Sequence, residues 1–176
     1  MDGLRIRTGG PADGPAIAAL HAASWQTAYA HILSEAYRQT APADRLRMWQ
    51  ARMSVWDPAR MHLAVAERGS ELVGFGCVLA DAEPDHGALL DNLHIRPDLK
   101  GGGVGRLLLT ACAQWVAMTF PGRAMHLTCY VDNAPAARFY RRRGGVESAP
   151  FGYLAPDGTS YSAVRFSWAE PGTLAP

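Results

Sequence analysis

A glycine-rich loop is the part of this sequence with the clearest chemical use. Residues 100–106 read Lys-Gly-Gly-Gly-Val-Gly-Arg, after an apolar segment that ends before Pro97 and ahead of the apolar run 107–109. Glycine has no Cβ, so the backbone N–H groups of such a loop can come very close to a ligand. A helix that starts there adds the partial positive charge of its N-terminus, which favours phosphate. The loop therefore predicts a site for a ligand that carries a pyrophosphate.

A second segment, residues 133–143, has the pattern of a capped helix. Asn133 suits the N-cap, because its side-chain oxygen can accept a hydrogen bond from the first turn, and Pro135 is tolerated there. Asn133 and Tyr140 are seven residues apart, which is about two helical turns, so they lie on nearly one face. The same pattern also fits a purely structural helix with Phe139 in the core and Tyr140 at its margin.

Two other kinds of phosphate-binding loop fit the glycines less well. A nucleoside-triphosphate loop needs lysine and then serine or threonine after its last glycine, whereas Arg106 and Leu107 follow Gly105. A dinucleotide-binding fingerprint needs a third small residue, and Leu108 occupies that position. A tight turn without a ligand is the structural alternative, and the second motif downstream argues against it.

The elements that would position the two motifs follow from hydrophobic periodicity and from glycine and proline breaks. Strands are predicted at residues 4–7, 62–66, 72–79, 88–95, 125–131, 151–154 and 160–168, and helices at 17–28, 44–53, 103–120 and 133–143. Residues 67–71 are expected to form a hairpin turn, 81–86 a polar loop and 156–158 a turn, while 29–40 stay ambiguous. Asp13 is the expected cap of the first helix, and Leu46, Trp49 and Met53 should share one helix face. This order predicts one α+β domain with a mostly antiparallel sheet.

Length and composition fit a single globular domain. The chain has 176 residues, of which 48% are hydrophobic and 19% charged, and its formal net charge is +1. That charge gives no case for a nucleic-acid or membrane-surface partner, and no apolar run is long enough to span a bilayer. The N-terminal segment lacks the apolar core of a secretory signal, so we expect a cytoplasmic protein.

The cysteines and histidines predict neither disulfides nor a metal site. Cys77, Cys112 and Cys129 are widely spaced in apolar surroundings, so free buried thiols are expected. The histidines without metal-ligand spacing, which we expect at the core edge or on the surface, are His21, His31, His62 and His126.

Together, the two motifs resemble those of the GCN5-related N-acetyltransferase (GNAT) family, whose members bind acetyl-coenzyme A. The family signature is Arg/Gln-x-x-Gly-x-Gly/Ala, and residues 100–105 fit it except that Lys100 takes the first position. The order of predicted elements is similar too. The resemblance implies one acetyltransferase domain over residues 1–176, with helices flanking a twisted, mostly antiparallel sheet that splays at its middle strand. Its parts would be acceptor-side helices at about 12–56, an acetyl-coenzyme A core at about 61–145 and C-terminal strands at about 146–170.

The resemblance also implies roles for individual residues. Contacts to acetyl-coenzyme A are expected from Leu93, His94, Ile95, Lys100, Gly101, Gly102, Gly103, Val104, Gly105, Arg106, Asn133 and Tyr140. Asn133 would help to hold the pantetheine arm, and Tyr140 would act as general acid toward the departing thiolate. The backbone N–H of Ile95 would stabilise the oxyanion, because the family splays its sheet there. A homodimer is consistent with the same resemblance.

The resemblance leaves open which group deprotonates the acceptor. Many relatives carry a glutamate as base on the middle strand, where this chain has Leu89. An alkylamine has a pKa near ~10.4, so its attack on a thioester needs a base or a proton-relaying water. Candidates for that relay are Asp91, His94, Asp85 and His86. By strand alternation Asp91 shares a face with Leu93 and Ile95, and His94 lies on the other face unless a bulge intervenes.

These features predict direct transfer of an acetyl group from acetyl-coenzyme A to a primary amine within a ternary complex. The alternatives are a coenzyme-A-binding regulatory or inactive module without turnover, and a nucleotide-dependent enzyme. Residues 20–60 and 147–168, which should line the acceptor pocket, hold several aromatics and few acidic groups, and this disfavours polycationic acceptors. A small amine, an amino-acid derivative and a peptide N-terminus stay open. The arginines at 141–143 fit a solvated helix end better than a contact with the 3′-phosphate of the coenzyme.

Overall fold

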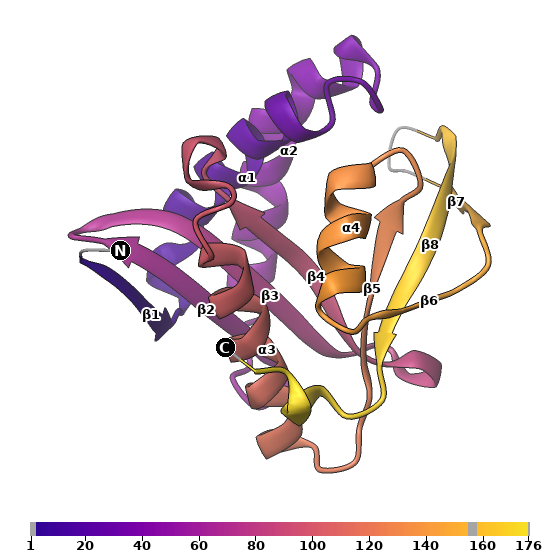
Figure 1. Ribbon diagram of the computed structural model, residues 1–176. Helices are drawn as coiled ribbons and strands as arrows, with labels where there is room; N and C mark the ends of the chain where they lie inside the picture. Colours follow the sequence, from indigo (N-terminus) through magenta and orange to yellow (C-terminus); the bar gives the residue numbers. More distant parts are fainter. Residues whose placement is uncertain (1–2, 155–157, 176) are drawn as a thin grey trace.

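The computed structural model describes residues 3–154 and 158–175, and within them one mixed sheet carries helices on both faces (Figure 1). The main elements are β1 (Leu4–Thr8), α1 (Gly14–Ala28), α2 (Glu35–Ser54), β2 (Met61–Arg68), β3 (Glu71–Glu83), β4 (Gly87–Ile95), α3 (Val104–Thr119), β5 (Met125–Tyr130), α4 (Ala134–Arg142), β6 (Val146–Glu147), β7 (Phe151–Leu154) and β8 (Ser160–Trp168). In this described part of the chain the strand order is β1-β2-β3-β4-β5-β8-β6, and β7 also pairs with β8. The pairing of β4 with β5 is parallel and the others are antiparallel. The predicted α+β class is therefore confirmed.

The two faces of the sheet carry separate hydrophobic clusters. Helices α1 and α2 pack on one face, where Ile17 and Trp49 are fully buried with Phe75 of β3. Helices α3 and α4 cover the other face (Figure 1), where Leu108 of α3 and Tyr140 of α4 belong to one larger cluster. The sheet is thus the middle layer of three, and its helices are fixed by apolar burial on both sides.

Helix α2 is longer than its sequence pattern indicates. It was predicted at residues 44–53, but it begins at Glu35, where the Ser34 hydroxyl accepts a hydrogen bond from the Tyr37 N–H at 3.2 Å. The helix continues through Pro42, whose ring nitrogen cannot donate to the carbonyl of Arg38. The Gln26 side chain of α1 donates to that carbonyl instead, at 2.7 Å. A contact from a neighbouring helix therefore satisfies the group that proline leaves without a partner.

Two further expectations, the loop at 81–86 and the cap at Asp13, differ from the structure. The loop predicted at 81–86 is wrong in its first half, because β3 continues to Glu83 before a short 3-10 turn at Pro84–His86. The short strand β6 was not predicted. Asp13 stands at the N-cap of α1 but does not cap it, because its carboxylate accepts from Arg7 at 2.6 Å and from the Gly10 N–H at 2.9 Å. The turn predicted at 156–158 lies mostly outside the described residues.

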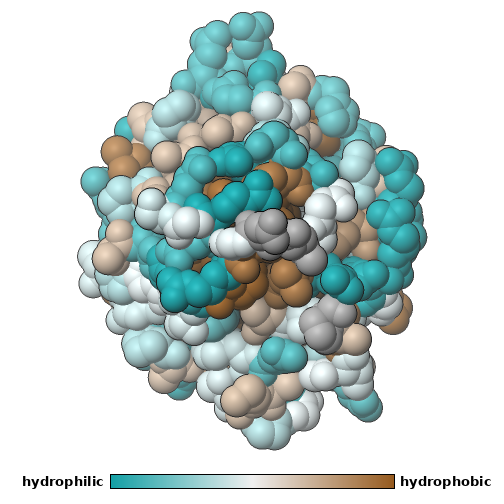
Figure 2. Space-filling view, turned by 60° about the vertical axis from the view of Figure 1, so that its left-hand side comes forward, coloured by the Kyte–Doolittle hydropathy of each residue, from teal (hydrophilic) through white to brown (hydrophobic). Residues whose placement is uncertain are grey.

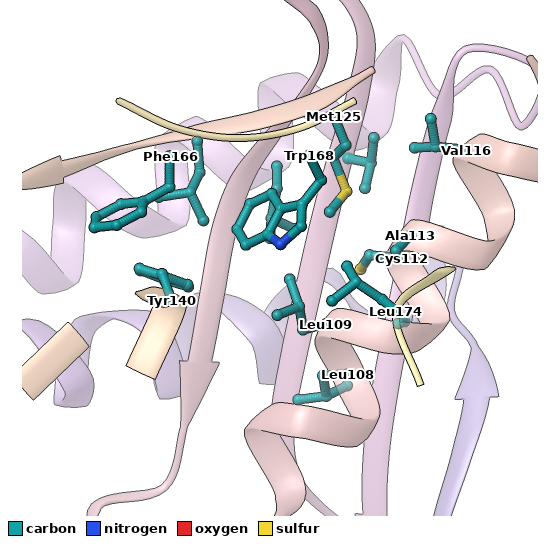
Figure 3. Close-up of a cluster of buried hydrophobic side chains, with 14 of the residues drawn as sticks. Leu108, Leu109, Cys112, Ala113, Val116, Met125, Tyr140, Phe166, Trp168 and Leu174 are labelled. Carbon is teal, nitrogen blue, oxygen red and sulfur yellow. The ribbon is translucent and has the colours of Figure 1, made fainter. Parts of the chain in front are cut away.

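Trp168, the last residue of β8, is a central side chain of the larger cluster. Its indole lies between Tyr140 and Phe166 on one side and Leu109 of α3 on the other (Figure 3). The indole N–H donates to the carbonyl of Arg143, just past the end of α4, at 2.9 Å. One side chain therefore packs the core and also satisfies a carbonyl at the helix end.

We expect Trp168→Phe to lower the free energy of unfolding by about 1–2 kcal/mol, since it leaves a carbonyl without its donor and a small void. Urea denaturation measures the change. Trp56→Phe is the matched control, because the Trp56 ring is only partly buried and its N–H donates to no group in residues 3–154 or 158–175. Equal losses in the two variants would contradict the importance of the Trp168 hydrogen bond.

The outer surface is mostly polar on the side that Figure 2 shows. Teal and white residues cover most of that view, and brown hydrophobic residues gather near its centre and at a few places on its edge. Among the described residues, no helix combines the length and the apolar character that crossing a bilayer would require. The three cysteines are buried and free, as expected from the sequence.

The sheet opens between its two middle strands. β4 and β5 pair only at Ala88–Met125 and Leu89–His126, so the rest of β4 has no partner on that edge within the described chain. The ribbons of β4 and β5 diverge from this point, and α4 lies beside the gap (Figure 1). The predicted splay at the middle strand is confirmed. Unpaired backbone groups along such an edge are available to a ligand.

A bulge in β4 changes which side chains face each layer. Val78 of β3 pairs with Leu90 and Cys77 pairs with Asn92, so Asp91 is an extra residue in β4. Before the bulge Leu90 belongs to the α3 cluster, and after it Leu93 and Ile95 pack against that same cluster. The alternation is therefore reset at Asp91.

Asp91 consequently lies on the side of α1 and α2, where Arg52 of α2 donates to its carboxylate at 2.7 Å. The expectation that Asp91 shares a face with Leu93 and Ile95 was wrong. His94 lies on the same side as Asp91, against His21 of α1.

Candidate active site

The glycine loop forms an uncapped helix N-terminus, as the sequence predicts. Gly103 is the N-cap of α3 and has φ +85°, in the left-handed region, and it brings no side-chain hydrogen bond to the helix end. The backbone N–H groups that donate to no group in the described chain are those of Gly101, Gly103, Val104 and Gly105. A Cβ added at Gly101 or Gly103 would meet nothing within 4 Å, so this side of the loop is open. Four free donors at a helix N-terminus make a place for an anion.

Unpaired cations surround these donors. A cavity of about 450 Å³ extends from the loop toward α4, and four of its basic residues form no ion pair with another described residue: Lys100, Arg106, Arg142 and Arg143. Arg96 and Arg141 are different, because Arg96 pairs with Glu71 and Asp98, and Arg141 pairs with Glu147 at 2.5 Å. The three arginines at 141–143 therefore differ in their surroundings: the first is paired with Glu147, and the last two line the cavity without an ionic partner in the described chain. The donors and cations together fit a diphosphate with a further phosphate nearby.

The middle of this cavity is built from β4 and α4. Leu93, His94 and Ile95 line it from the strand. Asn133 lines it from the start of α4, where its side chain accepts from the Ala136 N–H at 3.3 Å and so caps the helix as expected. Of the residues predicted to contact the coenzyme, the cavity lining lacks only Gly102 and Val104.

The unpaired edge of β4 supplies a donor in this cavity. The Arg96 N–H donates to the Val73 carbonyl of β3 at 2.9 Å. Donors alternate between the two edges of an antiparallel strand, so the Ile95 N–H is directed to the opposite edge. That edge faces the opening between β4 and β5, where an oxyanion could accept this hydrogen bond.

A second cavity, of about 520 Å³, joins the first from the side of α1 and α2. Its lining includes Leu89 and, two residues further along β4, Asp91. Trp25, Tyr130 and Tyr153 form much of its wall. The residues that line both cavities are Tyr29, His94, Asn133, Ala136 and Tyr140. A molecule in one cavity could therefore meet a molecule in the other at these side chains.

Tyr140 is buried, and its ring contacts Phe139, Phe166 and Trp168. The structural interpretation with Phe139 in the core and Tyr140 at the margin was the wrong way round, because Phe139 is the more exposed of the two. Burial raises the pKa of the Tyr140 phenol well above its usual range. The hydroxyl therefore keeps its proton at neutral pH and is a stable hydrogen-bond donor.

His94 is a buried, neutral imidazole at the junction. Its Nδ1 lies 3.1 Å from the Ser24 hydroxyl, and its ring is 4.4 Å from that of His21. Burial is the main cause that lowers the pKa of His94 to about 3, and nearby Lys100 and Arg45 lower it further. It can accept a proton through its free electron pair, but it is a weak base and does not hold the proton.

The titratable residues of the second cavity include Asp91, as expected, but not two of the other candidates. Asp85 and His86 line neither cavity, so the structure does not bring these two candidates to the site. Glu83, which the sequence analysis missed, does line the second cavity, where Arg165 and His126 contact its carboxylate, each at 3.2 Å. The sequence offered no reason to place Glu83 in the site, because the residue was assigned to a polar loop and not to the end of strand β3.

The remaining histidines are mostly core residues. His21, His62 and His126 are buried, so the expectation of a core-edge or surface position was wrong for these three, whereas His31 is exposed. Burial lowers the pKa of His62 to about 4, and its ring stacks on Trp115. Within the described residues, the His, Cys, Asp and Glu side chains do not gather in groups of three that could hold a metal ion.

Comparison with a protein family agrees with this arrangement. The model of the Acetyltransferase (GNAT) family matches residues 25–145, which is more than half of the chain. The chain belongs to the GNAT acetyltransferase family. It is therefore an acyltransferase, and acetyl transfer is the general chemistry of its family. A search of curated proteins found no match.

Solved structures show the same fold as this GNAT domain. A GCN5-related N-acetyltransferase from Rhodopseudomonas palustris is 21% identical, with 96% of this chain and 97% of that one covered and a TM-score of 0.75. The paia N-acetyltransferase from Thermoplasma acidophilum, in complex with coenzyme A, is 18% identical, with 92% and 97% covered and a TM-score of 0.68. The structure of yncA from Salmonella typhimurium, with acetyl-coenzyme A, is 17% identical, with 98% and 97% covered and a TM-score of 0.69.

Proposed function

We propose that this GNAT domain transfers an acetyl group from acetyl-coenzyme A directly to a primary amine. The observation that carries the proposal is the junction of two cavities at His94, Asn133 and Tyr140. One cavity has free amides and cations for a coenzyme, and the other has aromatic walls for an acceptor. The names of two structurally similar proteins, both N-acetyltransferases, support nitrogen as the acceptor atom.

The first cavity would hold the coenzyme along its whole length. The free N–H groups at the start of α3 would bind the diphosphate, with Lys100 and Arg106 neutralising its charge. Arg142 and Arg143 would meet the 3′-phosphate, and Asn133 the pantetheine arm. When bound, the coenzyme supplies an activated acetyl thioester, whose carbonyl would lie at the open edge of β4.

The chain's own groups would then stabilise charge and move protons. As the C–N bond forms, the Ile95 N–H would donate to the oxyanion. As the C–S bond breaks, Tyr140 would donate its hydroxyl hydrogen to the departing thiolate. The thiol that results resembles the side chain of cysteine, whose pKa is about 8.5. The acceptor amine must lose a proton, and we propose that water relays it past His94 to Asp91, since both face the second cavity.

A coenzyme-A-binding module without turnover is the second candidate. It is favoured by Leu89, which gives the second cavity no carboxylate at the position of the base in many relatives. It is also favoured by the lowered pKa of His94, which makes that imidazole a weak base.

Coenzyme binding and thiol release separate these functions. We expect acetyl-coenzyme A to bind in calorimetry, ATP and NAD not to compete with it, and free thiol to appear when a panel of primary amines is added. Binding without thiol release from any amine would favour the regulatory module. Binding of ATP or NAD but not of coenzyme A would contradict both.

A further inference from the structure

Arg45 is a buried cation in the second cavity that has no anionic partner. It lies in the middle of α2, lines the cavity, and its residue is only 9% exposed. Its Nε is buried without a hydrogen bond, and no carboxylate of residues 3–154 or 158–175 forms an ion pair with it. Its guanidinium carbon lies 4.3 Å from the centre of the Trp25 ring, which holds the group in place but does not neutralise it.

The other arginines of this region are neutralised. Arg52, on the same face of α2, pairs with Asp91 at 2.7 Å. Arg165 pairs with Glu83, the second acidic residue of the cavity lining. Both carboxylates that line the cavity therefore already have a cationic partner. No carboxylate of the described cavity lining is available to neutralise Arg45.

Burying a charge without a partner is energetically unfavourable, so proteins rarely do so unless a ligand of opposite charge binds there. Guanidinium presents a planar set of N–H donors that fits a carboxylate with two parallel hydrogen bonds. Arg45 lines the same cavity as His94 and Tyr153, so it lies on the acceptor side of the junction where the amine would meet the thioester.

We propose that Arg45 binds a carboxylate of the acceptor, so that the substrate is an amine that also carries a carboxylate, such as a free amino acid. This inference rests on the proposed function and names the substrate class of the same site. The aromatic walls at Trp25, Tyr130 and Tyr153 would contact the apolar part of that molecule. Arg45 is thus a specificity-determining residue and takes no part in bond making.

The test compares the proteinogenic L-amino acids with their carboxamides. A carboxamide has a less basic amine and so a larger neutral fraction, which by itself favours the amide over the acid. We nevertheless expect kcat/KM for the preferred acid to exceed that for its amide by about 30-fold, which corresponds to ~2 kcal/mol. Arg45→Met should bring this ratio to one or below, and Arg45→Lys should keep part of it. Arg47→Met, an exposed arginine of the same helix, should leave the ratio unchanged.

Thermal unfolding gives a readout that needs no turnover. With coenzyme A present, the preferred acid should raise the Tm of the wild-type protein, the amide should not, and neither should raise that of Arg45→Met. Without ligand, Arg45→Met should unfold at the same temperature or a higher one, because it removes an uncompensated charge.

An acid-to-amide ratio of one or less in the wild-type protein, or a ratio that survives Arg45→Met, overturns the inference and leaves acetyl transfer standing. If no amine of either kind releases thiol, the wider panel of primary amines decides whether acetyl transfer itself fails. The Tm comparison then still decides whether Arg45 binds the carboxylate, and an acid-dependent shift that persists in Arg45→Met would overturn it.

Discussion

Replacing Gly103 by valine is expected to weaken the binding of coenzyme A by about 100-fold or more. Gly103 has φ +85°, a conformation that a β-branched residue strongly disfavours. Its added side chain would also project into the open space at the start of α3, where the diphosphate is proposed to lie. Loss of two charge-assisted hydrogen bonds at about 1.5 kcal/mol each would account for an effect of this size.

Gly122→Val is the control for the strain itself. Gly122 has φ +80° and open space at its Cβ position, and it lines neither cavity. Both variants should therefore lose a similar amount of folding stability, while only Gly103→Val loses affinity for coenzyme A in calorimetry. Equal affinities for the two variants would show that the diphosphate does not bind at this loop.

The features that the sequence predicted well are those set by local rules. The start of α3 at the glycine loop follows from the glycines that interrupt the chain and the apolar run after them, and Asn133 follows from the capping preference of its side chain. Both rules act over a few residues, so neither requires knowledge of the tertiary structure. Strands β7 and β8 were likewise predicted with their observed bounds, because alternation and the flanking breaks were clear.

The features that were missed depend on contacts between distant residues. The predicted face of α2 included Leu46, which is 42% exposed, whereas Arg45 beside it is buried. Periodicity assigns leucine to the core and arginine to solvent, but the packing of α2 against Trp25 reverses that order. The path of α2 through Pro42 also depends on a neighbouring helix. The residue that carries the inferred specificity was therefore hidden from sequence reasoning.

The bulge at Asp91 is a second feature that sequence reasoning could not predict, because it depends on pairing with another strand. Alternation along β4 would separate Asp91 from His94, and only an extra residue opposite β3 brings both to the second cavity. No residue type near Asp91 indicates that β4 contains a bulge. Sequence reasoning could thus include Asp91 and His94 among four candidates for the proton relay, but it could not give the geometry that brings these two together.

Tyr140→Phe is expected to lower kcat by about 100-fold and to leave the affinity for coenzyme A nearly unchanged. The substitution removes one oxygen and keeps the ring that packs against Phe166 and Trp168, so the fold should not change. The lost interaction is needed only as the thiolate leaves, and the loss of such an interaction lowers kcat and kcat/KM together. Steady-state kinetics with acetyl-coenzyme A and calorimetry with coenzyme A measure the two quantities.

The pH profile adds a direct check on the raised pKa of Tyr140. A raised pKa means that the protonated phenol persists to higher pH, so the wild-type rate should show no fall from phenol ionisation up to about pH 10. Tyr161→Phe is the control, because Tyr161 packs on Tyr130 without lining either cavity. If Tyr140→Phe kept the full rate, or if Tyr161→Phe lost as much, the leaving thiolate would have to take its proton from water. The buried phenol would then act only through the packing of its ring.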